Sequence, residues 1–209
     1  MEAQDKGNTM RTGFRAFFII VIALAMIGCG QRAGGEKVLL DFESDGDLDR
    51  IDWRCQILFT LSEEHVTHGA RSLRMELYPS EYPGLSPKMA IHDWRGYVAL
   101  CFDVYNPQAE TRTLSVRIDD RKDYPTYEER FNARFLLEPG RNSVRIPLRE
   151  LVTSGVGGPL DLGGIQRLVI FVARPDGVIV LYLDHLRLEP ERPHSSQRPG
   201  ISPDPLSAS

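Results

Sequence analysis

The chain has 209 residues, and its 25 lysines and arginines are outnumbered by 29 acidic residues, giving a formal net charge of −4. This balance lacks the basic surplus that is typical of nucleic-acid-binding domains. The length suffices for one domain with a substantial core. The sequence contains no GxSxG, HExxH, P-loop or CxxC motif, so it carries no signature of these familiar enzyme classes.

The first part of the chain has the pattern of an export signal. Arg11 and Arg15 precede an apolar run over residues 16–27, which Gly28 and Cys29 follow at once. Positive charge, a short apolar stretch and then a small residue are typical of a secretory signal peptide. A membrane-spanning helix needs about 20 apolar residues, and this run is shorter. A transmembrane anchor is therefore only the alternative interpretation.

The segment MIGC over residues 26–29 resembles the lipobox of bacterial lipoproteins. The resemblance implies cleavage just before Cys29, acylation of its thiol and anchoring to a membrane of the cell envelope. Met26 departs from the leucine usual in the family, and Gly30, in place of aspartate, favours the outer membrane if the cell has one. The alternative is a signal peptide cleaved elsewhere, with Cys29 unmodified. Met10 is a second candidate for the true start.

The chain therefore divides into four predicted parts: a signal peptide with lipobox at 1–29, a tether at 30–35, an ordered domain at 36–190 and a tail at 191–209. The small and polar residues of the tether are typical of flexible linkers. The tail is rich in proline, serine and arginine and lacks apolar periodicity. Because it cannot bury enough apolar surface to offset the entropy of ordering, we expect it to be disordered.

Short runs of alternating apolar and polar residues recur throughout the domain. Residues 72–78, 98–105 and 114–119 all show this period of two, which is the pattern of a half-buried strand. The run LVIFVA at 168–173 is apolar on both faces, as expected of a central strand. Turn-forming residues separate about ten such runs. The pattern predicts an all-β fold, an antiparallel β-sandwich of the jelly-roll type.

Several segments of the domain, taken in order, resemble a known family. They are LLDFES at 39–44, THGARSLRMEL at 67–77, DWRGYVALCFDVYNP at 93–107, VRIDD at 116–120 followed by ERFN at 129–132, FLLEPGRNSVRIPL at 135–148 and LYLDHLRL at 181–188. Together they are similar to jelly-roll domains with a galactose-binding-like fold that occur as carbohydrate-binding modules, often attached to glycoside hydrolases. The resemblance covers nearly all of the ordered domain and rests on dispersed pattern rather than on one motif. It implies a glycan-binding domain.

The same resemblance implies a structural calcium ion. Its side-chain ligands would be Glu43 and Asp184, with backbone oxygens near His68 and Ser72 and with Asp41 as a reserve ligand. Calcium takes hard oxygen ligands such as carboxylates and carbonyls. Asp184 also interrupts an apolar terminal strand, where an unpaired carboxylate would be costly. The alternative is that Asp184 caps a turn or pairs with an arginine.

The segment RIDDRKDYPTYEERFN at 117–132 is the richest candidate for a sugar site. Sugar sites combine aromatic faces with a few placed polar groups. The candidate contacts are Arg117, Asp119, Tyr124, Tyr127 and Arg130. Since the polar sheet face often forms the groove in this family, four residues of other strands are further candidates: Arg74, Glu76, Tyr105 and Arg145. The alternative is an ordinary polar surface with weak salt bridges.

Four further residues have predicted structural roles. Trp53 and Trp94 each adjoin the start of a strand, and we expect both to pack in the core. Cys55 and Cys101 lie in strand-like runs. In an exported compartment they could pair, and the alternative is two buried free thiols.

The residue pattern favours a binding protein over an enzyme. His65 and His68 lie in strand and turn rather than on one helix face, so they do not predict a zinc site. Asp119 and Asp120 are adjacent on a strand and point to opposite faces, which disfavours a shared hydrolytic site. We predict a non-catalytic lipoprotein that binds a glycan on a polar sheet face. The alternative is a structural or partner-binding lipoprotein with no sugar site, and weak glycosidase activity is the least favoured reading.

Overall fold

The computed structural model describes residues 35–155 and 157–191. The predicted signal peptide with Cys29, most of the tether and the tail beyond residue 191 lie outside this range. Within it the chain forms strands β1 to β11 and three short 3-10 helices, η1 (Asp45–Arg50), η2 (Tyr127–Glu129) and η3 (Leu148–Glu150). No helix of the described part is long and apolar enough to cross a membrane.

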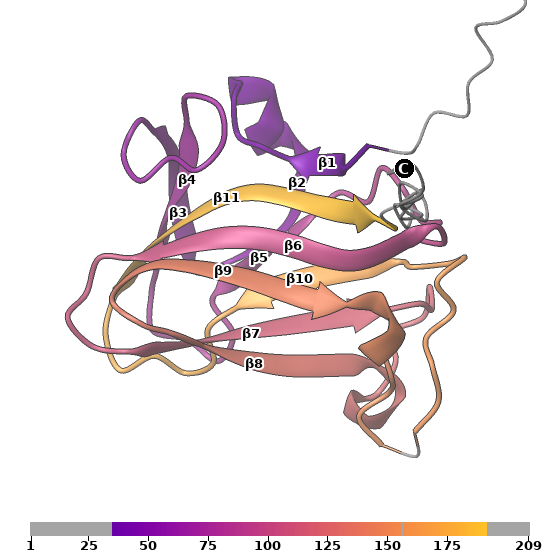
Figure 1. Cartoon of the computed structure of the whole chain (residues 1–209). Helices are drawn as coiled ribbons and strands as arrows, with labels where there is room; N and C mark the ends of the chain where they lie inside the picture. Colours follow the sequence, from indigo (N-terminus) through magenta and orange to yellow (C-terminus); the bar gives the residue numbers. More distant parts are fainter. Residues whose placement is uncertain (1–34, 156, 192–209) are drawn as a thin grey trace, which may run out of the picture. The chain divides into compact units, whose positions relative to one another are not determined.

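One sheet has six strands, in the order β3–β4–β11–β6–β9, with β1 added alongside β11. All of its pairings are antiparallel. Its long strand β11 pairs with β6 along one edge. Along the other edge it pairs first with β4 and then with β1 (Figure 1). The strands are β1 (Lys37–Leu40), β3 (Ile57–Ser62), β4 (Ser72–Leu77), β6 (Tyr97–Asn106), β9 (Gly140–Pro147) and β11 (Ile179–Pro190).

The second sheet has five strands in the order β2–β5–β10–β7–β8, again all antiparallel. The apolar run at 168–173 supplies most of β10, which lies in the middle of this sheet between β5 and β7, as predicted for a central strand. The strands are β2 (Ile51–Cys55), β5 (Gly84–Pro87), β7 (Arg112–Asp119), β8 (Phe131–Leu137) and β10 (Arg167–Phe171). The predicted all-β antiparallel sandwich is therefore confirmed.

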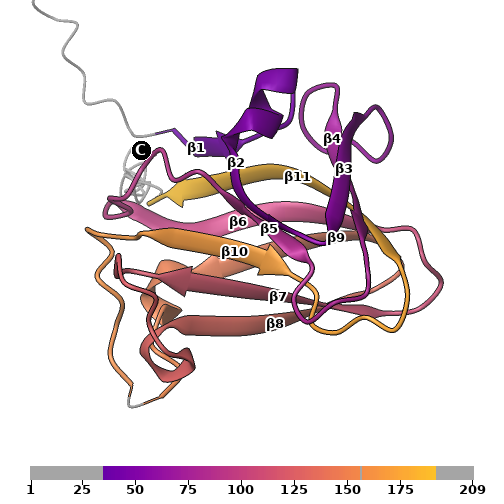
Figure 2. The ribbon, with the colours of Figure 1, turned by 180° about the vertical axis from the view of Figure 1, so that it is seen from behind.

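The two sheets lie face to face with one apolar core between them (Figure 2). The period of two decides which side chains enter it: Leu114, Val116 and Ile118 of β7 are almost fully buried, and Arg117 between them is not. Trp94 is fully buried in the core, as predicted. The prediction for Trp53 is wrong. Its side chain is 38% exposed because β2 is an edge strand, paired only with β5, and little covers its outer face.

Gly84 in β5 is a position where only glycine fits. A Cβ atom there would lie 2.3 Å from the carbonyl oxygen of Ile170 and 2.5 Å from the Cβ of Phe171 on the paired strand β10. The missing side chain thus lets β5 and β10 approach closely. Phe171, seated against this glycine, packs edge-on against Tyr82 with ring centroids 5.6 Å apart.

The two cysteines of the domain are free, so of the two alternatives the unpaired thiols hold. Cys55 lies on β2 and Cys101 on β6, which belong to different sheets. Burial raises the pKa of the Cys101 thiol to about 12, so this thiol is inert at neutral pH.

Candidate functional site

A groove of about 1120 Å³ lies over the five-stranded sheet. Its floor is the sheet face turned away from the core, because the side chains that line it alternate with the buried ones along β7 and β10. Arg117 and Ser115 line it from β7, and Arg167 and Phe171 from β10. The edge strands β2 and β8 and the segment 124–130 complete the wall. All five strands of one sheet therefore build this single concave surface.

Exposed aromatic rings surround the groove. The side chains of Trp53, Tyr82, Tyr124 and Tyr127 are 38%, 47%, 84% and 55% exposed, and all four line it. Large exposed aromatic side chains gathered in one concave surface are a feature expected of a ligand site, because soluble domains rarely expose so many apolar side chains in one patch. The rings offer flat apolar faces on which a sugar ring can lie.

A buried carboxylate holds two of the groove's arginines in place. Asp119 has no exposed surface. It accepts hydrogen bonds from Arg117 Nε at 2.8 Å and Nη2 at 2.6 Å, and from Arg167 Nη1 at 2.5 Å. Residues 119 and 167 face each other in the β7–β10 register, which brings the three side chains together. Asp119 is therefore a positioning residue beneath the floor and does not line the groove.

Two further arginines line the groove without an acidic partner among the described residues, Arg130 and Arg134. The Nε atom of Arg130 is buried and has no hydrogen-bond partner there. Burial, followed by repulsion from Arg117, lowers the pKa of the Arg130 guanidinium. The guanidinium carbon of Arg130 lies 5.8 Å from the ring centroid of Tyr127, and that of Arg167 lies 4.5 Å from the ring centroid of Tyr124. Cationic and aromatic groups thus alternate around the site.

The structure brings four of the five predicted contacts, Arg117, Tyr124, Tyr127 and Arg130, into one groove, with Asp119 beneath them. It does not bring in the other four candidates. Two lie on β4, one on β6 and one on β9, all strands of the opposite sheet, so the expectation of one shared face is wrong for Arg74, Glu76, Tyr105 and Arg145.

Sequence reasoning also missed several lining residues. Arg167 was detectable in principle, because it lies two and four residues before Val169 and Phe171 on β10, and residues spaced by two share one face of a strand. Asn132 and Arg134 lie at or just beyond the end of the candidate segment, on β8, and were not singled out. The other missed residues come from segments distant in sequence, and only the pairing of the strands places them here: Asp52, Tyr82 and Gln166.

The two predicted calcium ligands both bind the loop before β4. Glu43 accepts hydrogen bonds from the backbone N–H groups of Ala70 and Arg71 at 3.0 Å, and these bonds lower the pKa of its carboxyl. Asp184 accepts from the N–H groups of Thr67 and His68 at 2.7 and 3.0 Å. The loop thus presents donors, not carbonyl oxygens, to both carboxylates. As arranged they fit a role in anchoring the loop, and calcium binding stays a prediction.

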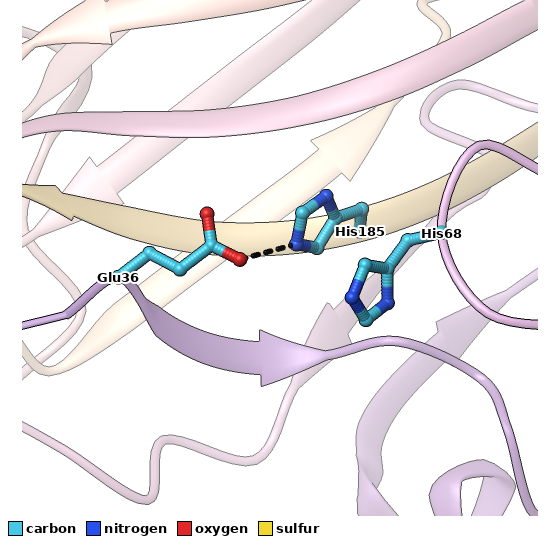
Figure 3. Close-up of side chains that lie close together, drawn as sticks. All are labelled: Glu36, His68 and His185. Atoms are coloured by element: carbon cyan, nitrogen blue, oxygen red, sulfur yellow. Dashed lines mark hydrogen bonds and ion pairs between the residues drawn. The ribbon is translucent and has the colours of Figure 1, made fainter.

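Glu36, His68 and His185, whose side chains are of types able to ligate a metal ion, lie close together at this loop (Figure 3). Glu36 precedes β1, His185 lies on β11, and His68 belongs to the anchored loop; each offers a ligand atom, and these atoms all lie within 4.8 Å of one another. His185 Nε2 is 3.0 Å from Glu36 Oε1. The two imidazole rings are stacked with centroids 4.0 Å apart.

Several carbohydrate-binding modules of known structure share the sandwich fold of this chain. A family 11 carbohydrate-binding module from Clostridium thermocellum, solved with a β-1,3-1,4-mixed-linked tetrasaccharide, matches with a TM-score of 0.57 at 14% identity, covering 75% of this chain and 96% of that one. The CBM22-1 xylan-binding domain of Xyn10C from Paenibacillus barcinonensis matches with a TM-score of 0.50 at 15% identity, covering 75% and 96%.

The domain is also similar to part of a larger protein. An exo-β-agarase matches with a TM-score of 0.61 at 17% identity, but the match covers 75% of this chain and only 26% of the agarase. No protein-family model matches the chain, and no curated protein is detectably similar in sequence. At these identities the likeness shows the fold: an antiparallel β-sandwich of the kind found in carbohydrate-binding modules.

The shared carboxylate predicts a large effect of the Asp119→Asn substitution. Loss of its charge leaves Arg117 and Arg167 with their partly buried guanidiniums unpaired, and we expect the free energy of unfolding to fall by about 3 kcal/mol. Denaturant unfolding measures this. The matched control is Asp93→Asn, whose partner Arg95 is well exposed, so stability should hardly change. Equal effects of the two substitutions would contradict a central role for Asp119.

Proposed function

We propose that the protein is a non-catalytic glycan-binding module, with its sugar site in the groove over the five-stranded sheet. The observation that carries the proposal is the set of four exposed aromatic side chains lining one groove together with arginines held from below. Aromatic faces stack on sugar rings, and guanidinium groups donate to hydroxyl or acidic oxygens. The likeness to modules solved as glycan binders supports the same function.

We also propose that the domain is attached to a membrane through acylated Cys29. The support is the export pattern before Cys29 and the MIGC segment. One acyl chain alone anchors a protein only weakly, so stable attachment requires more than one chain, as in typical bacterial lipoproteins. The module would then hold its glycan at the cell envelope. The alternative function is a structural or partner-binding lipoprotein that keeps the sandwich without a sugar site.

Glycan binding should depend on the exposed tyrosines. We expect the protein to bind at least one glycan class on an array, and the double substitution Tyr124→Ala/Tyr127→Ala to weaken binding about tenfold or more, because buried aromatic contacts dominate such interfaces. Calorimetry measures the affinity. The control is Leu58→Ala, an exposed apolar residue on β3 of the other sheet. Unchanged binding by the folded double variant would show that the groove is not the site; silence across the array would favour the structural alternative.

Lipidation is tested in a bacterium that expresses the full chain. We expect an alkyne-tagged fatty acid to label the protein and the protein to sediment with membranes, since the acyl chains supply the anchor. The Cys29→Ser variant should lose the label and leave the membrane fraction, whereas Cys55→Ser should keep both. A label that persists in Cys29→Ser, or membrane attachment without any label, would contradict the anchor at this cysteine.

A further inference from the structure

We propose that the glycan bound in the groove is acidic, carrying carboxylate or sulfate groups. This inference rests on the proposed glycan-binding function and names the class of its ligand. It follows from the charge of the lining, which differs in sign from that of the whole chain.

The groove carries a surplus of positive charge although the chain as a whole has a net charge of −4. Its charged lining consists of Asp52 and four arginines: Arg117, Arg130, Arg134 and Arg167. With Asp119 beneath the floor, four guanidiniums face only two carboxylates. Like charges gathered in one concave surface repel one another, and a bound anion relieves that repulsion.

The arginines differ in how far their own protein satisfies them. Arg117 and Arg167 share Asp119 and are held rigidly. Arg130 and Arg134 have no ion-pair partner among the described residues, and the buried Nε of Arg130 lacks any hydrogen-bond partner there. A guanidinium presents its donors as a planar fork that matches a carboxylate or sulfate with two parallel hydrogen bonds. A ligand anion at Arg130 would supply the acceptor that the protein does not.

A neutral glycan should bind to this groove more weakly than an acidic one. Its hydroxyl groups accept single hydrogen bonds from a guanidinium, and they lack both the negative charge and the paired acceptor oxygens of a carboxylate or sulfate. It would also cover the unpaired guanidiniums and remove water from them without giving a counter-charge, which costs free energy. The aromatic rim fits either kind of glycan, so the arginines decide between them.

The test compares each glycan with its own uncharged form. Calorimetry with the purified chain would use a sulfated galactan before and after desulfation, and oligogalacturonate before and after methyl esterification. We expect at least one charged form to bind at least tenfold more tightly than its neutral form, and added salt to weaken this binding. The two pairs distinguish sulfate from carboxylate. Arg130→Gln and Arg134→Gln should each weaken binding of the charged form, whereas Arg145→Gln on the opposite sheet should not.

Two results would overturn the acidic ligand. If neutral forms bind as tightly as charged ones, the groove binds glycans but does not select charge, and the proposed function stands alone. If no glycan of either kind binds the folded protein, the proposed function fails and the acidic ligand fails with it.

The cluster beside β1 carries a second, independent inference: we propose that Glu36, His68 and His185 bind a borderline transition-metal ion such as zinc. Two imidazoles and one carboxylate are a donor set that such ions accept and that calcium, which prefers oxygen, does not. The three ligand atoms lie within 4.8 Å of one another, and the 3.0 Å between His185 Nε2 and Glu36 Oε1 suits two ligands of one ion. A fourth position would be left to water.

Backbone strain and an unsatisfied atom support this site. His185 has a left-handed backbone with φ of 50°, and the pairing of β11 with β6 is interrupted between Asp184 and Arg187. Such strain is rare at a residue other than glycine and clusters at functional sites. The Nδ1 atom of His68 is buried without a hydrogen-bond partner in the described part of the chain.

The imidazole rings of His68 and His185 are stacked, so coordination of one ion by both requires one ring to turn about its Cβ–Cγ bond. Arg187 also contacts Glu36, at 3.5 Å, and competes for its carboxylate.

Calorimetric titration with zinc chloride and, separately, with calcium chloride tests the site. We expect saturable binding of one zinc ion, weakened at least tenfold in His68→Phe, which keeps the ring stacking, and in His185→Asn, since asparagine tolerates a left-handed backbone. His92→Gln removes an imidazole elsewhere and should not change it. Circular dichroism checks that each variant is folded.

Zinc binding that is absent, or that persists equally in both folded variants, would overturn this site. Saturable calcium binding without zinc binding would also overturn it; if that calcium binding is lost in Glu43→Gln, the calcium prediction for Glu43 and Asp184 is supported instead.

Discussion

Asp119 links strands β7 and β10 and fixes two of the arginines that line the groove over them. Its carboxylate lies on the outer face of the five-stranded sheet, covered by other side chains, and takes hydrogen bonds from one arginine on its own strand and one on the neighbouring strand. A buried carboxylate is tolerated only when it is paired and hydrogen-bonded. Here the pairing also fixes the direction of both guanidiniums. The geometry of the groove floor thus depends on the same contact that makes the buried charge acceptable.

The sandwich assigns different chemistry to its two sheets. The outer face of the five-stranded sheet is a groove with arginines and exposed aromatic rings. Near the six-stranded sheet, carboxylates and imidazoles gather where the start of β1, the bulge of β11 and the loop before β4 meet. The glycine at position 84 contributes to the first arrangement, since it lets Phe171 sit close to β5 and support the aromatic side of the groove. Loop anchoring by Glu43 and Asp184 contributes to the second.

The period of two along the chain was sufficient to predict the strands, the sandwich and a candidate surface near Arg117. The predicted contacts from Arg117 to Arg130 are close in sequence, and one strand and its following loop carry them, so local pattern could find them. It could not say which sheet each polar face belongs to, since that depends on strand register; hence the misplaced Arg74 and Arg145. Trp53 was assigned to the core because apolar character does not reveal an edge strand. Nor does any pattern predict the left-handed backbone of His185, which lies where the pairing of β11 with β6 is interrupted.

Because Asp119 holds two arginines, the entropic cost of ordering side chains on ligand binding should differ between the floor and the rim of the groove. Side chains tied to the floor have already lost their rotamer freedom on folding, so a ligand that contacts Arg117 and Arg167 pays little further entropy for ordering them. Tyr124, with 84% of its side chain exposed, has most of that freedom left to lose. In the proposed glycan complex, the floor would offer arginines at fixed positions to the charged groups of the ligand, whereas the rim would become ordered around each sugar ring at an entropic cost.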